Sequence, residues 1–234
     1  MSKSVQIIKG LGLRGNAFKA HLKTIELTSL QREVLVGTLL GDASFSLDKK
    51  RPKYSVKFEQ GKKNEAYVLH LFKIFKPFVG TGPVEREINK NRAPSEEVRY
   101  AVWFRTYQHD SLKYYYHSFY KQVLDPKNPK LVLKKTKIVP KNIGKLLTPR
   151  AIAYWFMDDG SYENQTCMLN TQGFEEKESQ LLCDILLEKY GIEAALSNNK
   201  GKKRIRIRTC SATVFRNLVE PYVIPHFRYR LINL

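Results

Sequence analysis

The sequence has few acidic side chains and few cysteines. It holds 22 aspartates and glutamates against 41 lysines and arginines, which gives a formal net charge of +19. Such an excess indicates a polyanionic partner, and with 12% aromatic residues in a folded chain nucleic acid fits better than a membrane surface. Three cysteines, Cys167, Cys183 and Cys210, lie far apart with no paired spacing, which indicates neither a disulfide framework nor a zinc site and predicts reduced core residues.

Long apolar runs are also missing. A membrane-spanning helix needs about 20 consecutive apolar residues, and no segment approaches that length. We therefore expect a soluble protein without a membrane partner. Because 42% of its 234 residues are hydrophobic, the chain can bury a sizeable core in one or two domains, which argues against disorder.

Two short apolar segments that end in a carboxylate are the strongest motif. Residues 35–43 read LVGTLLGDA and residues 152–160 read IAYWFMDDG, with Asp42 and Asp159 at the same eighth position. One such segment would normally be a buried helix that ends in a turn. Two copies can pack together and bring their acidic ends close, and neighbouring carboxylates are tolerated chiefly when a divalent cation lies between them. The repeat therefore predicts a metal site.

The two segments resemble the motif of the LAGLIDADG homing endonucleases, in the single-chain form with two motifs. Segments 147–160 and 220–231 look most like the subgroup encoded in group I introns of organellar large ribosomal RNA genes. Tyr154 replaces a motif glycine, but glycines of the partner helix can still admit it. The match rests on Leu35, Gly37, Gly41 and Asp42 in the first copy and on Ala153, Asp159 and Gly160 in the second.

This resemblance implies a site-specific DNA endonuclease that serves intron homing. It would cut both strands of a long asymmetric target by Mg²⁺-dependent hydrolysis, leaving short 3′ overhangs. Two or three Mg²⁺ ions would be shared between Asp42 and Asp159, with the backbone carbonyls of Gly41 and Asp158 as further ligands. The partner would be the major groove of double-stranded DNA, and the protein would act as a monomer in the mitochondrion or chloroplast that encodes it.

Two other functions remain open. An intron maturase would use the same surface to bind intron RNA without cutting, and a DNA-binding regulator would keep the surface after losing its active site. Retention of both Asp42 and Asp159 favours cleavage, because a protein that only binds gains nothing from two uncompensated acids beside DNA.

Hydrophobic periodicity predicts an α+β fold of two pseudo-symmetric αββαββα halves, whose antiparallel sheets form saddles around a central pair of motif helices. The basic segment at the N-terminus fits either a transit peptide or an arm on phosphate, and we favour the arm because the proteins it resembles are usually encoded inside the organelle. The lysine-rich connection is either a solvated surface or a strap over the DNA backbone. The predicted parts are 1–27 (arm), 28–122 (first half, with helix 111–122 at its end), 123–147 (linker) and 148–234 (second half, with strand 166–173).

Alternating basic positions predict the DNA-binding faces. Arg204, Arg206 and Arg208 alternate with two isoleucines, so three guanidinium groups project from one side of a strand. A polyanion would relieve their repulsion, and arginine matches guanine O6 and N7; the alternative is an edge strand with charges that deter aggregation. In the first half, alternation places Tyr100 inward and predicts DNA contacts at Ser44, Ser46, Lys53, Ser55, Lys57, Arg99, Trp103 and Arg105.

The resemblance supplies four further catalytic candidates. Gln60 and Gln172 match the glutamine that ends the strand after each motif, although simple hydrogen bonding at a strand end explains them as well. Lys137 and Arg230 fall near the family's pair of basic residues. Because arginine keeps its proton at any relevant pH, Arg230 would stabilise charge and not act as a base.

Overall fold

The computed structural model describes residues 15–46, 54–91, 93, 95–124, 126–128, 132–163 and 165–231. Its contacts divide the chain into two compact units. Among the described residues, unit 1 comprises 15–31, 43–46 and 54–113, and unit 2 comprises 32–42 and 114–231. Both motif segments therefore contribute their helices and aspartates to unit 2. The predicted domain boundaries follow the repeat in the sequence and stay a prediction.

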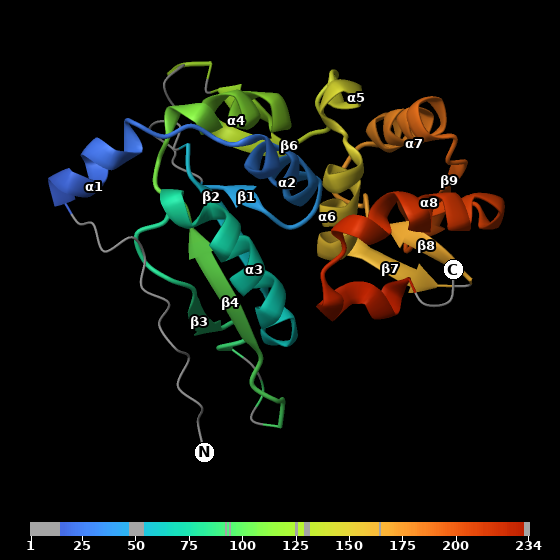
Figure 1. Cartoon of the computed structure of the whole chain (residues 1–234), viewed down its shortest axis with the longest axis horizontal. Coiled ribbons are helices and arrows are strands. Elements are labelled where there is room, and N and C mark those ends of the chain that lie inside the picture. The colour runs from blue at the N-terminus through green and yellow to red at the C-terminus, as the bar shows by residue number, and fades with distance from the viewer. Residues whose placement is uncertain are drawn as a thin grey trace. The chain divides into compact units, whose positions relative to one another are not determined.

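Unit 1 is a four-stranded antiparallel sheet with the strand order β1-β2-β4-β3, covered by α3 (Figure 1). The residues of α3 that the sequence places on one side, Tyr67, Val68, Leu71, Phe72 and Phe75, are all buried. Phe58 of β2 stacks on Phe75 and Phe104, with ring centroids 4.8 and 4.9 Å apart. The elements are α1 (Gly15–Leu22), β1 (Ser44–Phe45), β2 (Val56–Gly61), η1 (Lys62–Asn64), α3 (Glu65–Phe75), η2 (Lys76–Phe78), β3 (Val84–Glu87), β4 (Tyr100–Arg105) and η3 (Asp110–Leu112).

In unit 1, the predicted orientation of Tyr100 is wrong, and only part of the predicted arm is described. Tyr100, predicted to face the core, is 42% exposed. Strand β2 ends at Gly61 opposite Ala101, so Tyr100 has a neighbouring strand only on the β3 side. Residues 1–14 of the predicted arm and the turn that holds Lys53 lie outside the described residues, and the rest of the arm includes α1, whose Phe18 packs on Tyr107 with ring centroids 4.6 Å apart.

Unit 2 contains both motif helices, a second four-stranded antiparallel sheet of order β7-β8-β10-β9, and a two-stranded hairpin of β5 and β6. Helix α7 packs on β9 and β10, and α8 packs on α6 (Figure 1). The elements are α2 (Ser29–Leu40, in this unit from residue 32), α4 (Lys113–Phe119), β5 (Tyr120–Leu124), β6 (Val132–Lys137), α5 (Ile143–Leu146), α6 (Pro149–Asp159), β7 (Gly160–Glu163), β8 (Thr166–Leu169), α7 (Glu176–Tyr190), β9 (Ala194–Asn199), β10 (Lys202–Ile207), η4 (Thr209–Ser211), α8 (Ala212–Val219), η5 (Glu220–Tyr222) and η6 (Pro225–Arg230).

The helix predicted over residues 111–122 is wrong in its last part. The helical segment ends at Phe119, and residues 120–124 form β5, which pairs with β6 from the lysine-rich connection. The pairing is possible because lysine stems can lie along apolar surface. Lys135 lies over the rings of Tyr116 and Tyr120, 4.1 Å from each centroid. Part of the connection is thus an ordered hairpin.

The second half also departs from the prediction in detail. Strand β7 was not predicted, and β8 ends at Leu169, four residues before the expected end. Cys210, expected in the core, is exposed, whereas Cys167 and Cys183 are buried. The predicted α+β class with antiparallel sheets is confirmed, because α2 to α4 and α6 to α8 each follow the order αββαββα. No helix of the described ranges is long and apolar enough to cross a membrane.

Candidate active site and DNA-binding surface

Helix α2 contacts α6 through Gly37, and Gly41, directly after α2, extends this contact within unit 2. A Cβ atom built on Gly37 of α2 would lie 2.2 Å from the carbonyl oxygen of Ala151 and 2.8 Å from Cβ of Tyr154. A Cβ on Gly41 would lie 2.5 Å from Cβ of Asp158. These distances are too short for any side chain, so α2 can approach α6 this closely only with glycine at both positions. Tyr154 replaces a motif glycine in α6, and Gly37 of the partner helix makes room for it.

Helix α6 begins after Thr148, as its sequence predicts. The Thr148 side chain caps it by accepting a hydrogen bond of 3.2 Å from the Ala151 amide, and Pro149 occupies the first turn. In α2, Glu33 lies four residues before Gly37, and it accepts a hydrogen bond of 2.8 Å from Arg150 of α6. The capped start fixes where α6 begins, and its last residue is Asp159.

Three carboxyl groups gather where the motif helices end. The backbone amide of Asp42 donates a hydrogen bond of 2.8 Å to Oδ2 of Asp158. Burial, followed by the charge of Asp42, raises the pKa of Asp158 well above its usual range. The same two causes raise the pKa of Asp159 to about 7. The shared influence of Asp42 shows that the acids are close enough to repel one another, as the motif repeat predicts.

Lys137 of β6 lies beside these acids. Its Nζ donates a hydrogen bond of 2.5 Å to the carbonyl oxygen of Gly41. Burial lowers the pKa of Lys137 to about 8, although the charges of Asp158, Asp42 and Asp159 act in the opposite direction. An ammonium group with this pKa can give up its proton at mildly alkaline pH, which an ordinary surface lysine cannot do.

Arg230 binds the end of the other motif helix. Its Nη1 donates to three carbonyl oxygens, those of Phe156 at 3.2 Å, Met157 at 3.1 Å and Gly160 at 2.7 Å. The last carbonyls of a helix have no partner within the helix, and a cation there also complements the helix dipole. Arg230 therefore holds the end of α6 in place, and its charge lowers the pKa of Asp159 against the stronger effects that raise it.

Asn170 is a site residue that the sequence did not reveal. Its Nδ2 donates to Oδ1 of Asp159 at 3.3 Å, and its backbone amide donates to the Asp159 carbonyl at 3.1 Å. Gln172, the predicted candidate, donates to Oδ1 of Asn170 at 3.2 Å and so contacts Asp159 only through Asn170. A polar residue directly after an apolar strand was the available signal. Gln60 lies in unit 1, where it accepts a hydrogen bond of 3.2 Å from Asn64.

The donor set at the helix ends suits a hard divalent cation. Carboxylate and backbone carbonyl oxygens are the ligands that Mg²⁺ and Ca²⁺ prefer, and the repulsion among the acids is the condition that such a cation relieves. Within the described ranges, no group of three or more histidines, cysteines, aspartates or glutamates is arranged to hold a metal ion. A site here would therefore need two carboxylates completed by carbonyl, water or substrate oxygens.

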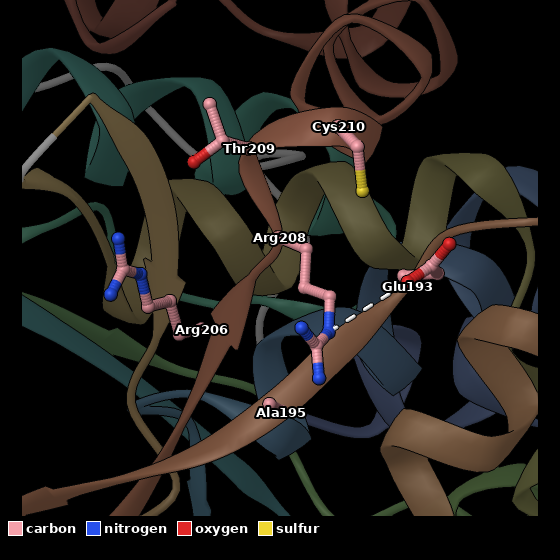
Figure 2. Close-up of a pocket in the computed structure, with 6 residues that line it drawn as sticks. All are labelled: Glu193, Ala195, Arg206, Arg208, Thr209 and Cys210. Atoms are coloured by element: carbon pink, nitrogen blue, oxygen red, sulfur yellow. Dashed lines mark ion pairs between the residues drawn. The ribbon is translucent and has the colours of Figure 1, made fainter.

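The three alternating arginines that the sequence predicts to bind DNA differ in their partners. Arg204 and Arg206 lie in β10, and Arg208 directly follows its last residue. Arg204 binds Glu163 through two nitrogens, at 2.7 and 3.0 Å, and its side chain is only 15% exposed. Arg208 lies 3.7 Å from Glu193. Arg206 is exposed, and Figure 2 shows it pointing away from Glu193. The pocket of about 400 Å³ in this view is lined by Glu193, Ala195, Arg206, Arg208, Thr209 and Cys210.

The solvent face of the unit 1 sheet carries a row of predicted contacts. Strand register places Ser44, Lys57 and Arg105 side by side on three adjacent strands. Trp103 lies next to this row, with Lys57 Nζ 5.4 Å and Arg105 Cζ 5.7 Å from its ring centroid. Of the other predicted contacts in unit 1, Arg99 is exposed and Ser46 is half-buried, whereas Ser55 is buried with its hydroxyl 3.0 Å from that of Ser46.

Comparison with known families tests whether the chain belongs to the family that its motifs resemble. Residues 32–215 match the LAGLIDADG DNA endonuclease family. The chain belongs to this family. The predicted membership and the predicted class of enzyme are both confirmed. The matched range includes both motif segments and the helices that cover the two sheets, α3 and α7.

Two individual proteins and one solved structure are similar over most of the chain. The probable intron-encoded endonuclease 1 of Wickerhamomyces canadensis is 31% identical, covering 95% of this chain and 93% of its own. The cytochrome b mRNA maturase bI2 of Saccharomyces cerevisiae is 27% identical over 86% of this chain and 47% of its own. The structure of the homing endonuclease I-WcaI bound to its DNA recognition sequence matches with a TM-score of 0.78 and 28% identity, covering 96% of both chains.

Proposed function

We propose that this protein is a homing endonuclease that cuts both strands of one long, asymmetric DNA site and leaves short 3′ overhangs. The observation that carries the proposal is the meeting of two motif helices whose ends bring Asp42 and Asp159 within each other's electrostatic influence. The similarity to a homing endonuclease bound to its DNA recognition sequence supports it. Since one chain supplies both aspartates, a monomer suffices.

Asp42 and Asp159 would hold Mg²⁺, with two or three ions shared between them and the carbonyls of Gly41 and Asp158 as additional ligands. When bound, Mg²⁺ supplies a nucleophilic water and neutralises charge on the attacked phosphate and on the leaving oxygen. The Gly41 carbonyl already accepts a hydrogen bond from Lys137, so metal ligation there requires the ammonium group to withdraw or share this oxygen.

The chain's own groups divide the remaining work. Lys137, whose pKa is lowered to about 8, can accept a proton from the attacking water near that pH. Arg230 stays charged, keeps the end of α6 fixed through its three carbonyl contacts, and stabilises negative charge. Gln172 orients Asn170, which in turn orients Asp159. For Gln60, a catalytic role stays a prediction.

DNA would lie along the basic faces of the two sheets in the major groove. Arg206 is the best placed of the three alternating arginines, because it is exposed and Arg204 and Arg208 have glutamate partners. On the unit 1 sheet, the row of Ser44, Lys57 and Arg105 beside Trp103 offers both charge and a flat aromatic surface. We place the protein in the organelle that encodes it.

A second candidate is an intron maturase that binds RNA. The similarity to the yeast cytochrome b mRNA maturase favours it, although that protein is about twice as long as the part matched here. A basic surface suits RNA as well as DNA, and the two activities do not exclude each other.

The proposal is tested by incubating the protein and Mg²⁺ with a randomised double-stranded DNA library and sequencing the cut ends. We expect the ends to converge on one long site with staggered breaks on the two strands. The Asp42→Asn, Asp159→Asn double variant serves as the control that should leave the library intact. A protein that binds intron RNA but yields no cut ends above this control would be a maturase and not an endonuclease.

A further inference from the structure

The peptide group between Gly41 and Asp42 is held from both sides by side chains. Its oxygen accepts a hydrogen bond of 2.5 Å from Nζ of Lys137, and its N–H donates one of 2.8 Å to Oδ2 of Asp158. Lys137 comes from β6 and Asp158 from α6, so the two contacts join this peptide to separate elements of unit 2. Because a peptide group is planar, fixing both ends fixes the orientation of its plane, and with it the position of the Asp42 Cα atom from which the side chain leaves the backbone.

Asp158 is built into this position. It is 9% exposed, and a Cβ on Gly41 would lie 2.5 Å from its Oδ2, so the carboxylate fills the space that a side chain at residue 41 would need. The backbone bonding of α2 ends with the Gly41 amide, which donates to the Gly37 carbonyl at 3.2 Å. The next amide, that of Asp42, turns to the opposite helix. Asp158 thus continues the bonding of α2 beyond its last turn.

The other motif aspartate is held in a different way. Asp159 receives two hydrogen bonds from Asn170, and Arg230 binds the carbonyls around it. The residue of α2 that corresponds to Asp158 in the motif repeat is Gly41, which has no side chain to offer. The two halves of the active site therefore depend on different supports, and only the Asp42 half depends on an acid from the opposite helix.

We propose that Asp158 is a positioning residue for Asp42. The carboxylate oxygen of Asp158 accepts a hydrogen bond from the Asp42 amide and so directs the Asp42 side chain toward the reacting phosphate. The side chain of Asp158 acts as a hydrogen-bond acceptor and not as a metal ligand. This inference rests on the proposed function only in that Asp42 serves cleavage. The hydrogen bond itself can be tested without DNA or metal.

Four substitutions, one of them a control, separate the possible roles. Asp158→Ala removes the acceptor, whereas Asp158→Asn keeps an acceptor oxygen of the same reach and removes the charge. Asp184→Ala is the matched control, because it deletes an exposed acid of α7 that is bonded to Gln180 at 2.8 Å. Gly41→Ala disrupts the same hydrogen bond without changing Asp158, since the new Cβ would displace the Asp158 carboxylate.

Cleavage is measured in single turnover at saturating protein and Mg²⁺, with DNA affinity measured separately. We expect Asp158→Ala to slow cleavage on the order of 10- to 100-fold without weakening DNA binding, because small displacements of catalytic groups cost rates of this size. Asp158→Asn should recover most of that loss, and Asp184→Ala should match the wild type. If Asp158→Asn loses as much rate as Asp158→Ala, the charge matters and the positioning role is overturned.

Hydrogen exchange of the Asp42 amide, followed by NMR in the DNA-free and metal-free protein, supplies a readout independent of activity. The amide should be protected in the wild type and in Asp158→Asn, and it should exchange much faster in Asp158→Ala and in Gly41→Ala. Equal protection of the amide in all four proteins would overturn the proposal. If Asp158→Ala folds poorly, Gly41→Ala takes its place, and protection equal to that of the wild type in Gly41→Ala would overturn the proposal in the same way. A wild type that shows the protection but cuts no DNA would instead contradict the proposed function.

Discussion

Gly37 of α2 lies directly against Tyr154 of α6, so closely that a Cβ on Gly37 would come within 2.8 Å of the Tyr154 Cβ. The motif's small residues are thus unequally divided between the two helices. Tyr154 is buried, and burial raises its pKa to about 12. The glycine of one helix makes room for the tyrosine of the other, and the acidic ends meet as a result.

The first prediction concerns this contact. Gly37→Ala should lower the free energy of unfolding by about 1 to 3 kcal/mol, because the added methyl group overpacks a close backbone approach and outweighs the better helix propensity of alanine. Gly144→Ala is the matched control in α5, where the new Cβ would lie 3.6 Å from Ile185, an ordinary contact. Urea unfolding of the three proteins measures the difference. Equal stability of the two variants would mean that the helices can separate at no cost.

The second prediction concerns pH and metal. Because the pKa of Asp159 is raised from 3.8 to about 7, the folded protein binds a proton that the unfolded chain has lost over this range. The stability from this group is complete below pH 3.8 and is lost as the pH rises through about 7. Mg²⁺ needs the ionised carboxylate, so its stabilising effect should grow over the same range.

Melting temperatures in EDTA and in Mg²⁺ measure this effect between about pH 5 and about pH 8. We expect the difference between the two conditions to be small at the acidic end and large at the alkaline end. Asp159→Asn should show little difference at any pH. A Mg²⁺ effect that is independent of pH, or that persists in Asp159→Asn, would remove Asp159 from the metal site.

The third prediction uses the net charge of +19. If many lysines and arginines contact phosphates, the logarithm of DNA affinity should fall with the logarithm of salt concentration by roughly 0.9 per phosphate neutralised. Titrations of the target DNA and of intron RNA at several salt concentrations give the two slopes. A steep slope for RNA with a slope near zero for DNA would support the maturase, and steep slopes for both would support a protein with both activities.

The fourth prediction distinguishes base reading from phosphate contact at Arg206. Arg206→Ala should cost on the order of 1 to 3 kcal/mol on the preferred site and relax discrimination at one or two adjacent base pairs. Arg208→Ala is the comparison, because Arg208 directly follows β10 and lies 3.7 Å from Glu193. Cleavage of all single-base variants of the target gives the profiles. An Arg206→Ala profile identical to that of the wild type would exclude base reading at this position.

Much of the fold was predictable because its periodicity is local. The buried face of α3 and the alternation of Ile205 and Ile207 in β10 follow directly from residue spacing. Strand β7 was not predictable, since its four residues are mostly polar and gain their place only by pairing with β8. The hairpin of β5 and β6 was missed because buried lysine stems give no hydrophobic signal.

The active site divides in the same way. Asp42 and Asp159 were predictable because each closes an apolar run in a repeated motif. The role of Asn170 depends on the pairing of β7 with β8, which returns the chain to the end of α6. Its place after an apolar strand marks it only as a polar residue at a strand end. The same holds for the ion pair of Arg204, whose partner Glu163 belongs to the strand that was not predicted.

The most direct test of the account is cleavage of a plasmid that carries the target by the wild type and by Asp42→Asn and Asp159→Asn, with binding measured in parallel. Each variant replaces an ionised carboxylate by a neutral amide of the same shape. We predict that the wild type linearises the plasmid in Mg²⁺ and not in EDTA, and that neither variant linearises it, while both bind the site within a few-fold of the wild type. If either variant cuts both strands at near wild-type rates, the two helix ends are not the catalytic centre.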